Sequence, residues 1–73
     1  MTKQEALEII KNENLKVNWF NSHPVEENEM VIEQKEEFYN VYGTDERAAI
    51  LGIVETFNSL SEALENLIYR ARL

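Results

Sequence analysis

Apolar residues recur at helical spacing near the start of the chain. Thr2 and Glu5 precede them in the pattern of a capping box. In this motif the threonine hydroxyl accepts from the Glu5 backbone N–H, and the Glu5 carboxylate accepts from the Thr2 backbone N–H. Asn12 and Asn14 are poor helix residues and end the pattern. We therefore predict a helix over residues 3–13. Its apolar face holds Ala6, Leu7, Ile9 and Ile10.

A second helical pattern occupies the last part of the chain. Ser59 and Glu62 again have capping-box spacing. Arg70 and Arg72 fall in the last turn, where their positive charge complements the helix dipole. We predict a helix that begins after Ser59. Its apolar side holds Leu60, Ala63, Leu64, Leu67, Ile68 and Ala71.

Residues 30–42 have the composition and alternation that are typical of a β-hairpin. We place the tight turn at Lys35-Glu36, which sets Ile32 opposite Tyr39. The face available to the helices then holds Met30, Ile32, Tyr39 and Val41, with Met30 opposite Val41. The other face mixes acids with aromatic residues: Glu29, Val31, Glu33, Phe38, Asn40 and Tyr42.

Residues 50–57 fit either a helix or a strand, because their apolar spacing suits the first and their β-branched residues suit the second. We predict a third strand, since β-branched residues dominate the second half and Asn58 ends it abruptly. A bulge near Gly52 would shift the phase and accommodate Glu55. The predicted inward set is Leu51, Ile53 and Phe57.

The predicted elements follow the order α-β-β-β-α, an α+β fold in which both helices pack on one face of a three-stranded antiparallel sheet. Residues 16–20 are expected to form a short extended piece before a turn at residues 21–24. A chain of 73 residues is expected to form a single compact domain over residues 1–73 with a small core. Without cysteine, an apolar run long enough to span a membrane or a signal-peptide pattern, a soluble cytoplasmic protein is expected.

The negative charge is concentrated in the middle of the chain. Residues 26–46 contain eight acids and one base, Lys35, so this segment alone accounts for the formal net charge of −7. The two flanking segments are neutral. Such a surface repels nucleic acid and anionic membranes, so the expected partner is a protein with a basic surface. Acidity that serves only to keep a small domain soluble is the alternative.

No residue pattern indicates catalysis. The chain has no nucleophile elbow, phosphate loop, zinc helix or cysteine pair. His23 is the only histidine, and we interpret it as a surface loop residue. Glu26, Glu27 and Glu29 could attract calcium loosely, but they lack the alternating Asp/Asn and glycine turn of an oxygen cage. We therefore expect no enzyme, no cofactor and no metal site.

A binding role remains. Acids on a rigid hairpin steer encounter with a basic partner, and aromatic residues among them supply buried anchors. Aromatic residues that merely fill the sheet are the alternative. The predicted partner-binding residues are Glu29, Glu33, Glu36, Glu37, Phe38, Tyr42, Asp45, Glu46 and Arg47.

Several short segments resemble the small immunity proteins of bacterial polymorphic toxin systems. They are Tyr39-Asn40-Val41-Tyr42, Thr44-Asp45-Glu46-Arg47, Val54-Glu55-Thr56-Phe57, Ser59 and Glu62-Ala63-Leu64-Glu65. The most specific is the Thr-Asp-Glu-Arg loop between two strands. The resemblance covers roughly residues 30–68. A glycine is expected after the arginine, where this chain has Ala48-Ala49.

The resemblance implies a non-enzymatic bacterial inhibitor that binds a cognate toxin and blocks it by steric and electrostatic occlusion. Two alternatives share the same gross features. One is a phage anti-defence protein that mimics DNA to inhibit a host nuclease, and the other is a small regulatory module without a toxin partner. Self-association through the free edge of the third strand also stays open.

Overall fold

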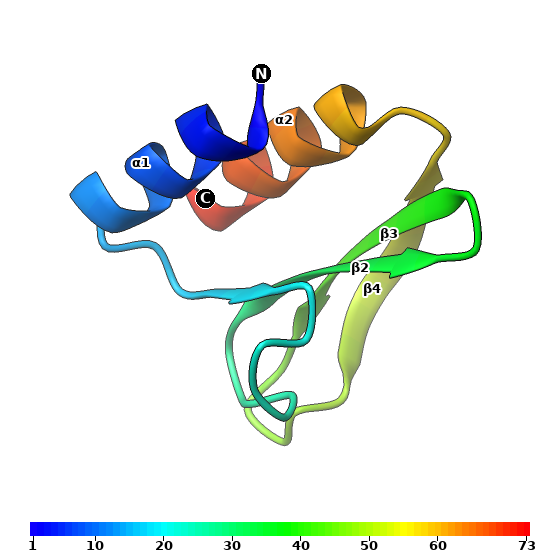
Figure 1. Ribbon diagram of the computed structural model, residues 1–73. Helices are drawn as coiled ribbons and strands as arrows, with labels where there is room; N and C mark the ends of the chain where they lie inside the picture. Colours follow the sequence, from blue (N-terminus) through cyan, green and yellow to red (C-terminus); the bar gives the residue numbers. More distant parts are fainter.

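The computed structural model describes all residues from 1 to 73 and shows an α+β fold in which two helices lie on one side of a sheet (Figure 1). The predicted third strand over residues 50–57 is confirmed over its whole length, and a helix follows it directly. The elements in chain order are α1 (Lys3–Asn12), β1 (Val17–Trp19), β2 (Met30–Lys35), β3 (Phe38–Thr44), β4 (Ile50–Phe57) and α2 (Leu60–Ala71).

The sheet has four strands in the order β1-β2-β3-β4, so the predicted three-stranded antiparallel sheet is wrong. The short piece predicted at residues 16–20 contributes the additional strand, β1. It pairs with β2 in parallel, with Val17 beside Met30 and Trp19 beside Ile32. Three residues are too few to show an alternating pattern. Strands β1 and β2 are also parallel, so no tight turn joins them and no turn residues indicate that they pair.

The β2–β3 hairpin turns at Glu36-Glu37, one residue later than predicted, so the partner of Ile32 is Val41 and not Tyr39. The pairing register therefore differs from the prediction by two residues. Because side chains alternate with a period of two, this shift leaves every residue on its predicted face. Glu36 has φ 58°, a left-handed conformation. Glycine or asparagine is the usual residue at such a turn position, so the sequence does not mark this turn.

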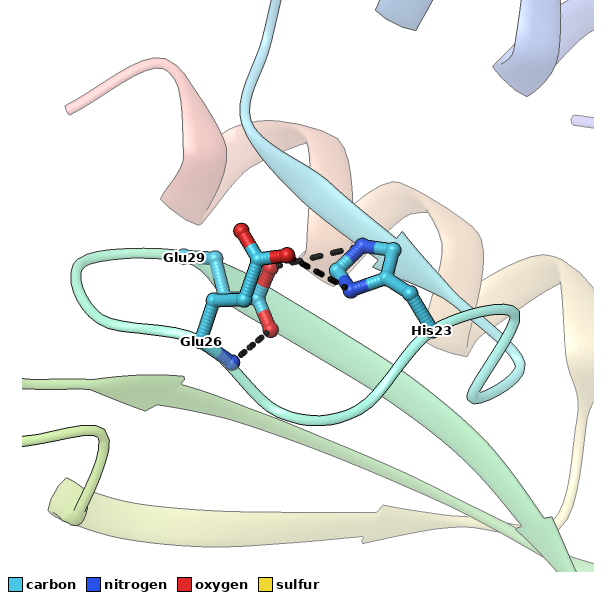
Figure 2. A group of neighbouring side chains, drawn as sticks. All are labelled: His23, Glu26 and Glu29. Carbon is cyan, nitrogen blue, oxygen red and sulfur yellow. Dashed lines mark hydrogen bonds and ion pairs between the residues drawn. The ribbon is translucent and has the colours of Figure 1, made fainter.

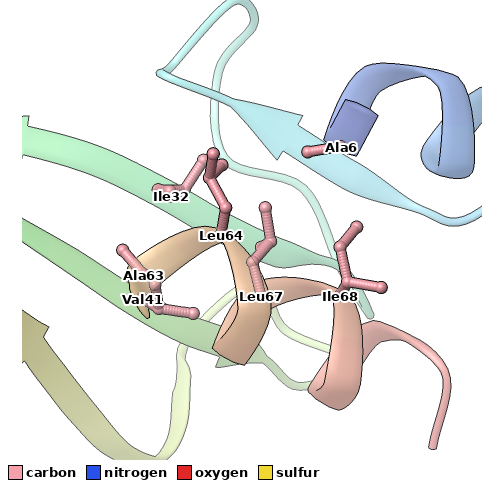
Figure 3. Close-up of a cluster of buried hydrophobic side chains, with 7 residues drawn as sticks. All are labelled: Ala6, Ile32, Val41, Ala63, Leu64, Leu67 and Ile68. Atoms are coloured by element: carbon pink, nitrogen blue, oxygen red, sulfur yellow. The ribbon is translucent and has the colours of Figure 1, made fainter. Parts of the chain in front are cut away.

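Helix α2 covers the sheet, and α1 packs beside α2. Figure 3 shows Leu64, Leu67 and Ile68 of α2 between the sheet and α1. The fully buried cluster joins one residue from α1, two from the sheet and four from α2: Ala6, Ile32, Val41, Ala63, Leu64, Leu67 and Ile68. These are the positions that the helical and strand patterns assign to the interior.

Both predicted helix starts are confirmed. Thr2 and Glu5 form a complete capping box, in which each side chain bonds the other residue's backbone N–H. Ser59 accepts from the Glu62 backbone N–H at 3.3 Å, without a reciprocal contact from Glu62. The helix ends are also tied together, because Arg72 donates to the carboxylate of Glu13.

Strand β4 contains the predicted irregularity. Val41 lies opposite Glu55 and Gly43 lies opposite Leu51, so one residue of β3 faces three of β4. Gly52 within this bulge has φ 78°, which glycine adopts without steric cost. Glu55 consequently reaches the helix side, where its carboxylate lies 3.6 Å from Arg70.

The predicted inward set of β4 is correct only in part. Phe57 packs against the core, whereas Leu51 and Ile53 are 60% and 72% exposed. The bulge removes the strict alternation on which that prediction depended. Separately, neither helix has the length and apolar character that crossing a membrane requires.

Candidate functional site

The predicted partner-binding residues do not form one patch, because the structure divides them between the two ends of β3. The turn end carries Glu33, Glu36, Glu37 and Phe38, and the loop end carries Asp45, Glu46 and Arg47. Seven residues at 3.3 Å each separate the two ends by roughly 20 Å. A single small contact therefore cannot use both ends equally.

The turn end presents an exposed aromatic ring among acids. Phe38 is 38% exposed and lies next to the Glu36-Glu37 turn. Behind it, Glu33 accepts from Asn40 Nδ2 at 3.2 Å, and Asn40 in turn accepts from the Thr56 hydroxyl at 2.7 Å. A shallow hollow on this surface is lined by Lys35, Glu36, Phe38, Asn40 and Thr56.

The loop end uses its acid internally. Asp45 Oδ1 accepts from the backbone N–H of Arg47 at 2.8 Å and of Ala49 at 3.0 Å. Ala48 has φ 62° and occupies a left-handed position in the loop over residues 45–49. Glu46 and Arg47 remain exposed. Asp45 therefore stabilises the loop, whereas Glu46 and Arg47 have side chains that a partner can reach.

Two predicted partner-binding residues are buried. Tyr42 is 8% exposed, and its burial raises the pKa of the phenol, with a further contribution from the charges on Glu33 and Glu29. Glu29 is 4% exposed. Its Oε2 accepts from Asn18 Nδ2 at 3.1 Å and from the Glu26 backbone N–H at 2.8 Å. In this conformation neither residue offers its side chain to a docking protein.

The segment from Phe20 to Glu29 lies against the sheet through these buried polar contacts. Thr44 Oγ1 accepts from the Glu29 backbone N–H at 2.9 Å and donates to the Glu26 carbonyl at 2.7 Å. Asn18 Nδ2 also donates to the His23 carbonyl at 2.9 Å. Sequence reasoning missed Asn18 and Thr44, because isolated polar residues within strands give no signal of the loop that they will hold.

His23, Glu26 and Glu29 form a compact group (Figure 2). His23 Nδ1 lies 3.4 Å from Glu26 Oε2, and His23 Nε2 lies 3.6 Å from Glu29 Oε1. The pKa of His23 is raised, first by the hydrogen bond from Nδ1 to the Pro24 carbonyl and then by the two carboxylates. The interpretation of His23 as an isolated surface residue missed these neighbours.

Strand β4 exposes a row of apolar side chains at the edge of the sheet. It pairs with another strand only on its β3 side, and the Ile53 carbonyl accepts from Arg70 Nη2 at 3.3 Å. The sequence pattern pointed two of these side chains inward and therefore did not reveal the surface. Its exposed members are Ile50, Leu51, Ile53 and Val54.

Residues 2–72 match the sequence profile of a protein family described as Immunity protein 59. The match covers nearly the whole chain, including both helices and all four strands. Comparison with curated proteins and with solved structures finds no match.

Proposed function

Because the chain belongs to the Immunity protein 59 family, we propose that it neutralises a cognate bacterial toxin by binding it and blocking a basic surface of that toxin. The family match carries this proposal. Immunity proteins are generally non-enzymatic, and this agrees with the absence of a recognisable catalytic motif in the sequence. The match favours a toxin partner over the phage inhibitor and the regulatory module.

The turn end of the hairpin is the proposed docking surface. Glu33, Glu36 and Glu37 supply negative charge, and Phe38 supplies an exposed ring on the same tip. Charges at the rim of an interface act mainly on the association rate, whereas an aromatic anchor acts on dissociation. Glu29 and Tyr42 have a supporting role in this proposal, because their burial leaves them no direct contact.

The proposal is tested with the toxin encoded beside this protein, as a growth-rescue assay and as purified-protein binding kinetics. Replacing Glu33, Glu36 and Glu37 with Gln should slow association at low salt and flatten its salt dependence. Phe38→Ala should instead speed dissociation by about 30-fold, which corresponds to a hot spot of about 2 kcal/mol.

A matched control removes three charges elsewhere. Glu8, Glu27 and Glu46 are exposed and lie away from the turn, so their replacement with Gln gives the same change in net charge. Equal slowing by both triple variants would contradict docking at the turn alone, because net charge or the loop end, where Glu46 lies, would then account for the effect. Failure of the parent protein to bind or rescue would contradict the toxin-neutralising function itself.

A further inference from the structure

We propose that His23, Glu26 and Glu29 bind a divalent transition-metal ion of the zinc type. One ligand atom from each residue lies within 4.8 Å of the other two. Two ligands of a tetrahedral zinc ion, each about 2.0–2.1 Å from the metal, lie about 3.4 Å apart. The 3.6 Å between His23 Nε2 and Glu29 Oε1 is already close to that spacing.

The histidine presents a free lone pair towards a carboxylate. Nδ1 lies 2.9 Å from the Pro24 carbonyl, which accepts only, so Nδ1 carries the proton. In the neutral imidazole, Nε2 then has no hydrogen and faces the negative Oε1 of Glu29. A second proton on the ring removes this repulsion, and so does a metal cation between the two atoms. A backbone hydrogen bond from Nδ1 is also the arrangement that orients histidine ligands in metal sites.

Glu29 is a buried carboxylate whose charge has no lysine or arginine beside it. Its side chain is 1% exposed, and its only ion-pair partner is His23. Two donors, Asn18 Nδ2 and the Glu26 backbone N–H, hold Oε2, so Oε1 faces the imidazole with no hydrogen bond of its own. These contacts fix one ligand in place, as outer hydrogen bonds do around metal ions.

Glu26 completes the set from a more exposed position. Its side chain is 57% exposed, so it can rotate towards the ion without disturbing the core. Figure 2 shows the two carboxylates side by side next to the imidazole ring. Three protein ligands leave a coordination position for water.

The ligand types select the metal. A nitrogen ligand with two carboxylates suits zinc and its first-row neighbours, whereas calcium requires six to eight oxygen ligands. The earlier argument against a calcium cage at Glu26, Glu27 and Glu29 therefore still applies. The structure replaces Glu27 in that set by a histidine, which changes the preferred ion.

Bound metal would join the loop to the sheet. His23, Glu26 and Glu29 all lie in the segment between β1 and β2, and the Glu29 backbone N–H donates to Thr44 of β3. An ion held by all three would restrain this segment. This inference is independent of the proposed toxin binding.

The test titrates ZnCl₂ into tag-free protein near pH 7.5 and follows the imidazole ¹⁵N signals together with calorimetric affinity. His23 is the only histidine, so its ring signals need no assignment. The Nε2 signal should shift on addition of zinc while Nδ1 stays protonated. Glu26→Gln and Glu29→Gln should each weaken zinc binding at least about tenfold, and CaCl₂ should not displace the ion.

Glu27→Gln is the matched control, since it removes the same charge from the neighbouring position and leaves the three ligands intact. Glu26 is exposed, so Glu26→Gln should retain the parental circular dichroism spectrum and test the site without unfolding. Imidazole signals that do not move in excess ZnCl₂ overturn the proposal and identify the group as a simple ion pair. Equal weakening by Glu26→Gln and Glu27→Gln overturns it as well, because only diffuse attraction would then remain.

Discussion

Ala48 carries φ 62° in the loop between β3 and β4, a conformation in which its methyl group crowds the following carbonyl. Ala48→Gly should therefore increase the free energy of unfolding by about 1 kcal/mol, measured by urea denaturation. The adjacent Ala49 does not have a positive φ, so Ala49→Gly should lower it. A stabilising Ala49→Gly together with a destabilising Ala48→Gly would contradict this loop geometry. The resemblance to immunity proteins pointed to glycine at the same place.

Asp45 and Arg47 belong to one loop but differ in role. Asp45 accepts two backbone hydrogen bonds, so Asp45→Ala should lower the free energy of unfolding by about 1–2 kcal/mol, comparable to loss of a helix cap. Arg47→Ala should change it by less than about 0.5 kcal/mol, because this side chain is exposed and makes no ion pair. Thermal melts of both variants measure the two losses of stability and so separate the structural role of Asp45 from the exposed charge of Arg47. Similar losses for both would assign Arg47 a structural role as well.

The two helices are joined at their C-terminal ends by Glu13 and Arg72. The hydrogen bond from Arg72 lowers the pKa of Glu13 below 4.5. The folded state therefore gains stability from this carboxylate above pH 4.5, and the gain disappears as the pH falls through the lower folded pKa. Arg72→Gln should destabilise the protein at neutral pH but not at the acid end of the titration. Arg47→Gln should leave the pH profile of stability unchanged, and a profile of Arg72→Gln parallel to the parent would refute the pair's contribution.

Two isoleucines in the sheet offer a matched comparison between a buried and an exposed site. Ile32 is fully buried against α2, so Ile32→Val should cost about 0.5–1.5 kcal/mol of unfolding free energy. Ile53 on β4 is largely exposed, so Ile53→Val should change it by less than about 0.5 kcal/mol. Urea denaturation of both variants measures the difference. The reverse order would mean that the bulge in β4 is misplaced.

The elements that the sequence predicted are those whose information is local. Capping residues and helical spacing located α1 and α2, and β-branched residues located β4. What it missed depends on distant partners. Strand β1 exists because β2 accepts it in parallel, and the exposure of Ile53 follows from a bulge whose extent only pairing with β3 defines. Leu51 pairs with Gly43 on the helix side and is still 60% exposed. The candidate site shows the same limit, since the neighbours of His23 are set by how the loop folds back.

At the scale of the whole molecule, β4 carries a group of exposed apolar side chains with little charge. It presents Ile50, Leu51, Ile53 and Val54 around a single acid, Glu55. A long apolar edge strand is prone to pair with another chain. Ile53→Lys should therefore lower self-association, measured by sedimentation velocity, with little loss of stability. Ile53→Ser, which is polar but uncharged, serves as the control. If the parent protein self-associates and Ile53→Lys sediments in the same way, this edge is not the contact.

The two edges of the sheet differ greatly in length. One edge is β1, which ends after three residues, and the other is β4, which runs for eight. Short outer strands give an incoming chain too few backbone partners to hold it. We therefore expect strand addition only at the β4 edge, and two β4 edges that paired would leave no long edge for a third chain. Any association through this edge is expected to give a closed pair or a one-to-one complex, and not a fibre.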